Sequence, residues 1–321
     1  MSDKPVLLLT RKYSANTEAR ASRDYQVIFN PDDTVYSSDQ LLEKCAGADA
    51  VIPCHSEHFN AVVAAQLPAR VKIIANHSVG VDHCDLAALK ARGVVVTNTP
   101  DVLSDATAEI GMLLMLGAAR RASEGDRMMR QGKWDSWSPA FMVGTQVTGK
   151  RIGIVGMGRV GQVMAKRARG MDMEVHYFNR SRLPGDKEAG AIFHDQLDDL
   201  LAVADVLSLH CPTTPETTGF MTAEKFALLP DGAIFVNTAR GALVDEEALV
   251  EALRSGKLAA AGLDVFVTEP GGNPKFATLE NIFMLPHIGS ATSQTRDAMG
   301  FRALDNIDAF FAGKEPKDRL V

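Results

Sequence analysis

The sequence predicts an α/β protein that is made of two doubly wound parallel sheets. Apolar runs alternate with amphipathic stretches through the first hundred residues, and the same alternation restarts after Gly149. The chain has 321 residues, which is enough for two domains of ordinary size. In an α/β protein of this kind, a cleft between the two domains is a favoured place for a ligand.

In the N-terminal region, short apolar runs are predicted to be strands and the stretches between them helices. The strand candidates are residues 6–9, 25–29, 50–53, 71–75 and 94–96, and the helix candidates are residues 17–23, 38–45, 58–66 and 86–92. A long helix is predicted over residues 104–131. The loop that follows, residues 132–148, carries both tryptophans, and loops of this length are often functional.

The second half repeats the pattern. Its strand candidates are residues 151–155, 174–178, 206–209, 233–236, 261–265 and 282–285, and its helix candidates include residues 160–169 and the final segment 292–311. The order of strands and helices again favours a parallel sheet with helices on both faces.

Three glycines form the most informative motif of the chain. Gly156, Gly158 and Gly161 follow the apolar run 151–155 and open the predicted helix 160–169, and a second strand candidate closes a βαβ unit. This is the dinucleotide-binding fingerprint, in which the glycines allow a tight turn, close approach to a pyrophosphate and close helix–strand packing. We therefore predict that residues 101–289 form a Rossmann domain, and that residues 1–100 and 290–321 form a flavodoxin-like substrate domain.

The residues after the second strand of this unit predict the cofactor. An acidic residue there would bind the ribose 2′-hydroxyl of NAD and repel a 2′-phosphate. This chain instead has Asn179, followed by Arg180, Ser181 and Arg182. Two arginines and a hydroxyl can bind a phosphate, so NADP(H) is expected in preference to NAD(H), which remains possible. The alternative is an ordinary solvated basic turn.

Composition excludes several classes of protein. The formal net charge is −6, and no basic stripe interleaved with aromatics is present, so nucleic-acid binding is disfavoured. No apolar run approaches the length of a membrane span, and residues 1–10 lack the features of a signal peptide. The four cysteines have no paired short spacing, which favours reduced thiols and a cytoplasmic protein.

Three charged residues follow predicted strands at the edge where ligands of open α/β sheets bind. Taken singly, Arg240, Glu269 and His287 are more often caps or ion-pair partners, but together they suit hydride transfer to a 2-keto acid. Arg240 would bind the substrate carboxylate, and His287 would donate a proton to the carbonyl oxygen. Glu269 would orient the imidazole and favour its protonated form. No metal is required.

Two further histidines lie close together in the sequence, but they are less indicative of a functional site. His55 and His58 flank Glu57, but no further metal ligands converge in the sequence, so a loop leading into a helix is favoured over a metal site. Because this loop follows a strand of a parallel sheet, Cys54, His55 and Ser56 are candidates for contact with substrate.

Across nearly its whole length the chain resembles the D-isomer-specific 2-hydroxyacid dehydrogenases, and within them the glyoxylate/hydroxypyruvate reductases. Besides the glycine fingerprint, the matching segments are residues 78–82, 98–103, 105–109, 210–213, 237–245, 264–266, 269–270 and 286–289, together with Trp134 and Trp137. The resemblance implies the same roles for Arg240, Glu269 and His287, and it gives the substrate carboxylate the backbone amides of Val79 and Gly80. It also implies a wider cofactor site, which comprises Thr107, Arg159, Val160, Cys211, Pro212, Thr217, Thr238, Ala239, Asp264 and Gly289.

The same resemblance implies a homodimer formed through the cofactor domains, with Trp137 reaching the partner's active site. Packing of the dimer alone is the alternative role for both tryptophans. At the position of Glu269 the formate dehydrogenases of the same superfamily have an amide side chain. A formate dehydrogenase is therefore disfavoured for this chain. A 3-phosphoglycerate, D-lactate or phosphite dehydrogenase remains open, as does a nucleotide-sensing, non-catalytic dimer, because fold alone does not separate these functions.

Overall fold

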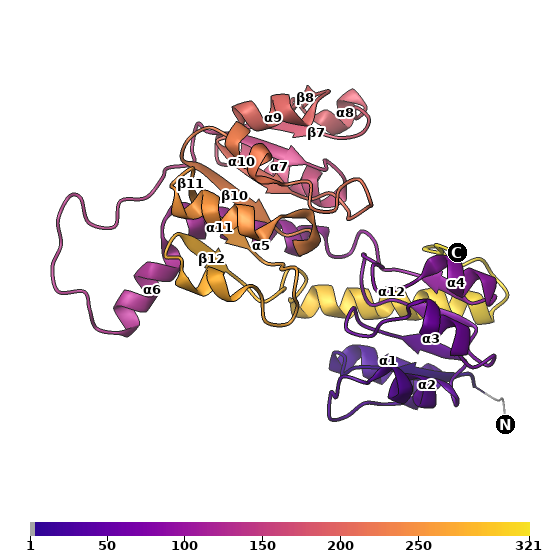
Figure 1. The fold of residues 1–321 in the computed structure, drawn as a ribbon. Helices are drawn as coiled ribbons and strands as arrows, with labels where there is room; N and C mark the ends of the chain where they lie inside the picture. The colour runs from indigo at the N-terminus through magenta and orange to yellow at the C-terminus, as the bar shows by residue number, and fades with distance from the viewer. Residues whose placement is uncertain (1–3) are drawn as a thin grey trace. The chain divides into compact units, whose positions relative to one another are not determined.

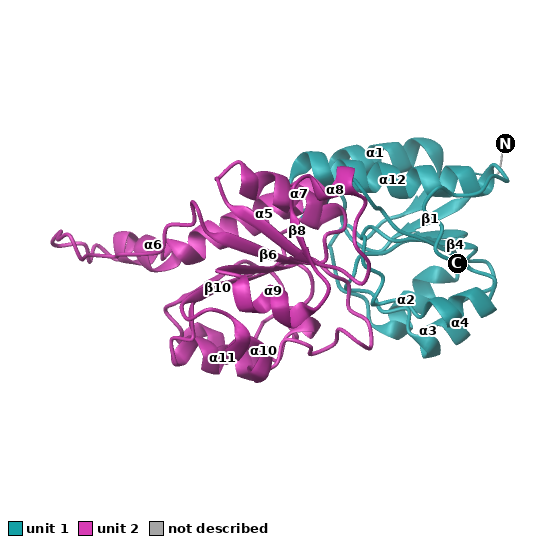
Figure 2. Ribbon diagram, turned by 90° about the horizontal axis from the view of Figure 1, so that it is seen from above, with its two compact units in different colours: residues 1–103, 290–321 teal, residues 104–289 magenta. Residues whose placement is uncertain are grey.

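The structure is a computed structural model that describes residues 4–321, so the first three residues of the predicted N-terminal domain lie outside the described residues. The chain divides into two compact units, one of residues 1–103 with 290–321 and one of residues 104–289 (Figure 2). Each unit contains one parallel sheet with helices on its faces, which confirms the predicted fold class.

The first unit has a five-stranded sheet in the order β2-β1-β3-β4-β5, with every neighbouring pair parallel (Figure 1). This order is flavodoxin-like. Its strands are β1 (Val6–Leu9), β2 (Gln26–Ile28), β3 (Ala50–Ile52), β4 (Ile73–Ala75) and β5 (Val95–Thr97), and its helices are α1 (Ala15–Asp24), α2 (Ser38–Cys45), α3 (Ala61–Gln66), α4 (Leu86–Ala91) and α12 (Ser293–Phe311).

The last helix of the chain completes this first unit. Helix α12 packs against α1, and the fit is close because Gly300 leaves room for the buried Thr17. A Cβ atom at Gly300 would lie 2.0 Å from Oγ1 of Thr17. Arg20 on α1 also pairs with Asp305 and Asp308 on α12, each at 2.7 Å. Residues 290–321 are therefore part of the sheet unit that begins near the N-terminus.

The second unit has a seven-stranded sheet in the order β12-β11-β10-β9-β6-β7-β8, again with every neighbouring pair parallel. The six strands from β11 to β8 have the Rossmann order, which reverses between β6 and β9, and β12 extends that sheet at one edge. The strands are β6 (Arg151–Val155), β7 (Glu174–Phe178), β8 (Ile192–His194), β9 (Val206–Leu209), β10 (Ala233–Asn237), β11 (Leu258–Leu263) and β12 (Ile282–Met284).

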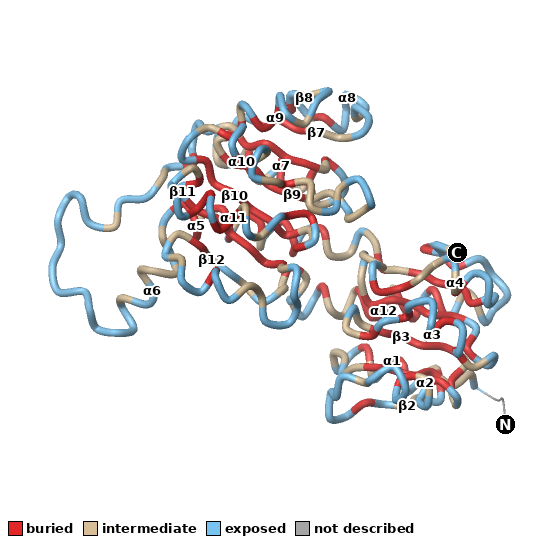
Figure 3. The backbone as a smooth tube through the Cα atoms, viewed as in Figure 1, coloured by how far each residue is buried: buried red, intermediate tan, exposed pale blue. Residues whose placement is uncertain are grey.

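Two clusters of buried hydrophobic residues form the core of this second unit, and most of its strands are buried (Figure 3). The helices of this unit are α5 (Ser104–Ala119), α6 (Ala122–Arg130), α7 (Arg159–Arg169), α8 (Gly185–Glu188), α9 (Leu197–Val203), α10 (Ala223–Leu228) and α11 (Glu246–Arg254), with short 3-10 turns at Gly241–Leu243 and Pro274–Thr278. Helix α6 has no buried residue and projects away from the sheet (Figure 1).

Two sequence-based element predictions for this unit need correction. The single helix predicted over residues 104–131 is two helices, α5 and α6, because Arg121 takes a left-handed conformation with φ of 54° and breaks the hydrogen-bonded ladder. Strand β11 ends at Leu263 instead of residue 265, which leaves Asp264 just beyond the strand. The segment after α6 extends away from the sheet and is largely exposed (Figure 3).

No helix among residues 4–321 is long and apolar enough to cross a membrane. The four cysteines are free thiols, and burial raises the pKa of Cys45 and of Cys84 to about 12. Both of these thiols therefore stay protonated and unreactive at neutral pH.

Candidate active site

The glycine turn lies between β6 and α7, at the point where the strand order of the second sheet reverses. Gly156 has φ of 95°, and a Cβ atom on it would lie 2.5 Å from the backbone nitrogen of Cys211, which follows β9. A Cβ atom on Gly161 would lie 2.3 Å from the carbonyl oxygen of Gly156. The first and third glycines are thus required by the close packing of strand, turn and helix.

The second glycine faces open space. Apart from its two neighbours in the chain, no described residue has an atom within 4 Å of a Cβ atom built on Gly158. Gly158 is the N-cap of α7, where no side chain caps the helix. Arg159 and Val160 form the first turn of this 11-residue helix. An uncapped helix start behind an open glycine fits a bound pyrophosphate, because the backbone amides and the helix dipole favour an anion there.

The end of β7 lies next to this turn. Asn179 accepts a hydrogen bond from the backbone nitrogen of Met157 through its Oδ1 atom at 2.7 Å, so its side chain closes the glycine loop. Arg180 and Ser181 are exposed. Arg182 forms two hydrogen bonds with the carboxylate of Glu188, at 2.8 and 3.1 Å. Of the two arginines predicted to bind a 2′-phosphate, one is therefore already paired with a carboxylate.

The loop after β9 is held in place by hydroxyl groups. Thr217 donates through Oγ1 to the carbonyl oxygen of Pro212 at 2.9 Å and accepts from the backbone nitrogen of Thr214 at 2.7 Å. His210 lies within hydrogen-bonding distance of Ser208 at 2.9 Å and of Thr238 at 3.4 Å. Burial lowers the pKa of His210 to about 4, so its imidazole is neutral at physiological pH and serves to join the ends of β9 and β10.

Asn237, which the sequence reasoning did not single out, shapes the turn that carries Arg240. Its buried side chain donates to the carbonyl oxygen of Arg240 at 2.8 Å and accepts from the backbone nitrogen of Ala239 at 2.9 Å. Arg240 donates through Nη1 to the carbonyl oxygen of Ala239 at 2.7 Å. An asparagine at the end of a strand and before a turn is the signal that indicates such a role.

The next residue brings two loops together. A Cβ atom on Gly241 would lie 1.9 Å from the carbonyl carbon of Phe266 and 2.3 Å from the backbone nitrogen of Val267. The turn after β10 therefore packs directly on the backbone of the loop after β11, which carries Glu269. Only glycine allows this approach.

The two residues predicted to form an acid–base pair, Glu269 and His287, lie in contact. Nδ1 of His287 lies 2.6 Å from Oε2 of Glu269, and Oε1 of the same carboxylate accepts a hydrogen bond from the backbone nitrogen of Phe266 at 2.7 Å. Both side chains are partly exposed, with 31% of the surface of His287 and 24% of that of Glu269 accessible. The carboxylate of Glu269 therefore fixes the side of the ring that carries Nδ1.

Asp264 holds the backbone that presents His287. Its two carboxylate oxygens accept hydrogen bonds from the backbone nitrogens of Ile288 and Gly289, at 2.8 and 2.7 Å. Burial raises the pKa of Asp264, and these two hydrogen bonds oppose the increase. Thr107 on α5 lies beside Gly289, 3.5 Å from the position of a Cβ atom there. Thr107, Asp264 and Gly289, which the family resemblance places in the cofactor site, are therefore neighbours.

In the first unit, the predicted substrate-binding turn follows β4. Ser78 donates through Oγ to the carbonyl oxygen of Gly80 at 2.7 Å, and Asn98 donates through Nδ2 to the carbonyl oxygen of Val79 at 2.8 Å. Both carbonyl oxygens are thereby occupied by groups of the protein itself. The turn is fixed at two points, as a rigid anion-binding turn requires.

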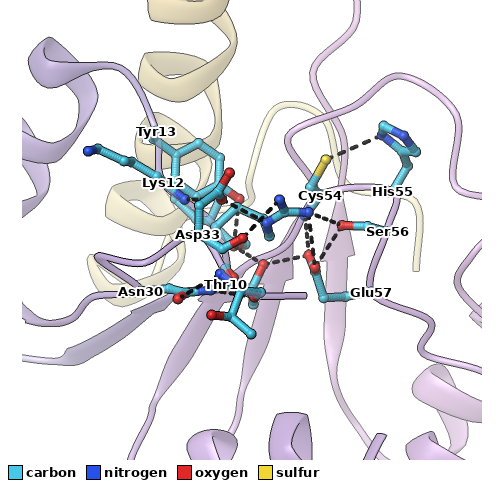
Figure 4. Close-up of polar contacts among 12 residues, drawn as sticks. Thr10, Lys12, Tyr13, Asn30, Asp33, Cys54, His55, Ser56 and Glu57 are labelled. Carbon is cyan, nitrogen blue, oxygen red and sulfur yellow. Dashed lines mark hydrogen bonds and ion pairs between the residues drawn. The ribbon is translucent and has the colours of Figure 1, made fainter. Parts of the chain in front are cut away.

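The loops after β1 and β3 are joined by a buried carboxylate (Figure 4). Glu57 accepts hydrogen bonds from Thr10 Oγ1 at 2.6 Å, Ser56 Oγ at 2.7 Å and the backbone nitrogen of Cys54 at 2.9 Å. Arg11 donates to Ser56 at 2.9 Å, while His55 lies 3.3 Å from the sulfur of Cys54. Glu57 is thus a structural link between the loops that follow β1 and β3.

Trp137 is 74% exposed and Trp134 is 53% exposed. Both lie in the extended segment after α6 (Figure 1), so the described residues of one chain do not bury either ring.

Substitutions at two glycines of this turn should have different effects, because Gly161 is required for packing whereas Gly158 is expected to face the ligand. The Gly161→Ala substitution should lower the free energy of unfolding by about 1–3 kcal/mol, because the new methyl group collides with the carbonyl oxygen of Gly156. The Gly158→Ala substitution meets open space and should leave the unfolding midpoint in urea nearly unchanged. It should nevertheless weaken binding of a dinucleotide, measured by calorimetry, because the methyl group stands where the pyrophosphate approaches. A loss of stability in Gly158→Ala, or full affinity in that variant, would contradict this division of roles.

A Rossmann sheet with a glycine turn at its switch point, and with an arginine, a carboxylate and an imidazole at its carboxyl edge, defines a nicotinamide-dependent oxidoreductase. Residues 112–289 match the model of the D-isomer specific 2-hydroxyacid dehydrogenase, NAD binding domain. The chain belongs to the D-isomer-specific 2-hydroxyacid dehydrogenase family, near the glyoxylate/hydroxypyruvate reductases, as its sequence predicts.

Named relatives cover the chain from end to end. A glycerate dehydrogenase of Hyphomicrobium methylovorum is 45% identical over 97% of this chain and 98% of its own length. A glyoxylate reductase of Thermococcus onnurineus is 42% identical over 98% of this chain and 95% of its own. The crystal structure of an NADPH-dependent glyoxylate/hydroxypyruvate reductase from Sinorhizobium meliloti, in complex with NADP and malonate, has a TM-score of 0.87 and 28% identity, and the match covers 99% of this chain and 97% of that one.

Proposed function

We propose that this protein is an NADPH-preferring reductase that converts glyoxylate to glycolate and hydroxypyruvate to D-glycerate. The observation that carries this proposal is the pair of Glu269 and His287, joined at 2.6 Å, on the same sheet edge as Arg240. The three residues follow β11, β12 and β10, which are consecutive in the sheet. Relatives named glycerate dehydrogenase and glyoxylate reductase support the choice of substrate.

In this mechanism the nicotinamide, when bound, supplies the hydride. Arg240 binds the carboxylate of the 2-keto acid with its planar guanidinium, and the backbone amides of Val79 and Gly80 bind the same group. His287 donates a proton from Nε2 to the carbonyl oxygen as negative charge develops there. Glu269 keeps the imidazole in one orientation and stabilises its positive charge. The reverse oxidation needs the neutral imidazole as a base.

In this proposal the two units have different roles. Residues 101–289 bind the dinucleotide, and residues 1–100 with 290–321 contribute the substrate-binding turn at residues 79 and 80.

We also propose a homodimer that buries the exposed Trp134 and Trp137, because large exposed aromatic side chains are typical of interface cores. Sedimentation equilibrium should give a mass twice that of the chain, and a Trp137→Ala variant with an unchanged mass but altered substrate preference would place this ring in the partner's site.

Oxidation of NADPH, followed optically, tests the proposed activity. The substrates to compare are glyoxylate, hydroxypyruvate, pyruvate and 3-phosphohydroxypyruvate. We expect the first two to give the highest kcat/KM. Absence of turnover on every 2-keto acid would refute the reductase proposal, and a preference for 3-phosphohydroxypyruvate would move the chain to another branch of its family.

The cofactor preference depends on Arg180. Replacing Arg180 with alanine should raise KM for NADPH by about tenfold to a hundredfold and leave KM for NADH nearly unchanged, because the guanidinium interacts only with the extra phosphate. Lys187→Ala removes an exposed cation from nearby α8 and is the matched control, with an expected change below about threefold. A wild-type protein that prefers NADH, or an Arg180→Ala variant with an unaltered ratio, would refute the NADPH assignment.

A further inference from the structure

A buried carboxylate lies beside the proposed 2′-phosphate site and pairs with one of its two arginines. Glu188, at the end of α8, is buried, whereas 65% of the side chain of Arg182 is exposed. The two groups form a two-pronged ion pair through Nε and Nη2 of the arginine, at 2.8 and 3.1 Å. Arg182 also stacks over the ring of Phe193, 5.9 Å from its centroid. This arginine is therefore held in one place before any cofactor binds.

Glu188 is itself fixed by further contacts. The buried hydroxyl of Tyr177, on β7, donates to its Oε1 atom at 2.6 Å, and the same hydroxyl accepts from the backbone nitrogen of Leu183 at 3.0 Å. Hydrogen bonds from Arg182 and Tyr177 hold the pKa of Glu188 below its usual value. The carboxylate is consequently charged at neutral pH and cannot turn away without leaving Tyr177 unsatisfied.

This arrangement bears on how strongly a 2′-phosphate is bound. A phosphate that approached Arg182 would meet a cation whose charge is already balanced by a carboxylate, and the carboxylate would repel it. Arg180 forms no such ion pair with α8, although the carboxylate of Glu216 is close enough to interact with its charge. We propose that Glu188 weakens the contribution of Arg182 and so limits the preference for NADPH over NADH, leaving Arg180 as the principal cation of the site.

This inference rests on the proposed location of the 2′-phosphate, but its test does not need turnover. Dissociation constants of NADPH and NADH are measured by calorimetry for the wild type, Glu188→Gln, Arg182→Ala and the double variant. Glutamine keeps the shape and can still accept from Tyr177, so the charge is the main difference. We expect Glu188→Gln to bind NADPH about three- to tenfold more tightly, with the affinity for NADH changed by less than about twofold.

The double variant makes the test specific to the pair. Arg182→Ala should weaken NADPH binding by less than about threefold in the wild-type background, and it should abolish the gain in the Glu188→Gln background. Unchanged or weaker NADPH binding in Glu188→Gln would overturn the inference. A tenfold or greater loss of NADPH affinity in Arg182→Ala alone would also overturn it. This second measurement does not require the Glu188→Gln variant to fold. If the wild type binds NADH more tightly than NADPH, the proposed NADPH preference is refuted, but the inference about Glu188 is not. The change in NADPH affinity caused by Glu188→Gln can still be measured in that case.

Discussion

Replacing His287 with alanine should lower kcat for reduction of glyoxylate by about a hundredfold to ten-thousandfold, while KM changes much less. In the proposed mechanism the imidazole acts when negative charge develops on the carbonyl oxygen, so its loss affects the transition state more than the bound ground state. Glu269 does not substitute for it, because its Oε1 atom is committed to the backbone nitrogen of Phe266.

The His58→Ala variant is the matched control for this experiment. His58 is exposed, lies outside the proposed site and should keep wild-type kinetics. Steady-state kinetics with saturating NADPH give both parameters, and the affinity for NADPH itself should not change. A His287→Ala variant that retained more than about a tenth of kcat would show that another group, or water, donates the proton.

His287 shows why the sequence predicts which residues form the candidate site but not the backbone conformation that positions them. The motif places a histidine after the last strand, but the structure adds that His287 has φ of 53°, a left-handed conformation that costs about 1–2 kcal/mol. The two hydrogen bonds to Asp264 from the following residues stabilise that conformation. The hydrogen bonds that offset the cost of this conformation join residues more than twenty positions apart, so no local sequence pattern indicates them.

The fold class could be predicted because most strands of both units are short buried apolar runs, which alternate with amphipathic helices. Edge strand β8 was not among the predicted strands, because it has only three residues, of which Ile192 is exposed and the other two are partly buried. The break between α5 and α6 was also missed, since Arg121 is an ordinary helix former whose left-handed conformation depends on its surroundings.

Glu188 shows the same limit for the cofactor site. The basic turn at residues 180–182 is visible in the sequence, but the carboxylate that pairs with Arg182 belongs to a one-turn helix and is fixed by Tyr177 from a separate strand. Charged residues near a predicted site therefore indicate its chemistry, whereas the strength of each contact depends on partners that only the folded chain brings together.

Replacing Arg240 with alanine should raise KM for glyoxylate and lower kcat together, for a loss in kcat/KM of about a hundredfold to a thousandfold. Arg240 would hold the substrate carboxylate in the ground state and in the transition state, so both parameters depend on it, in contrast to His287. Its position is set by the turn that Asn237 closes, and by Gly241, which packs on the backbone of the loop that carries Glu269. Loss of the side chain alone should leave this packing, and hence the unfolding midpoint, nearly unchanged.

Lysine at the same position separates charge from geometry. Arg240→Lys keeps the positive charge but lacks the planar fork that binds both oxygens of a carboxylate, so we expect it to recover less than about a tenth of the lost kcat/KM. Arg254→Ala, at the exposed end of α11, is the control for removal of an arginine from the same unit and should have wild-type kinetics. Full activity in Arg240→Lys would show that charge alone is sufficient, and an Arg240→Ala variant with unchanged KM would assign the binding of the carboxylate to the backbone amides of Val79 and Gly80.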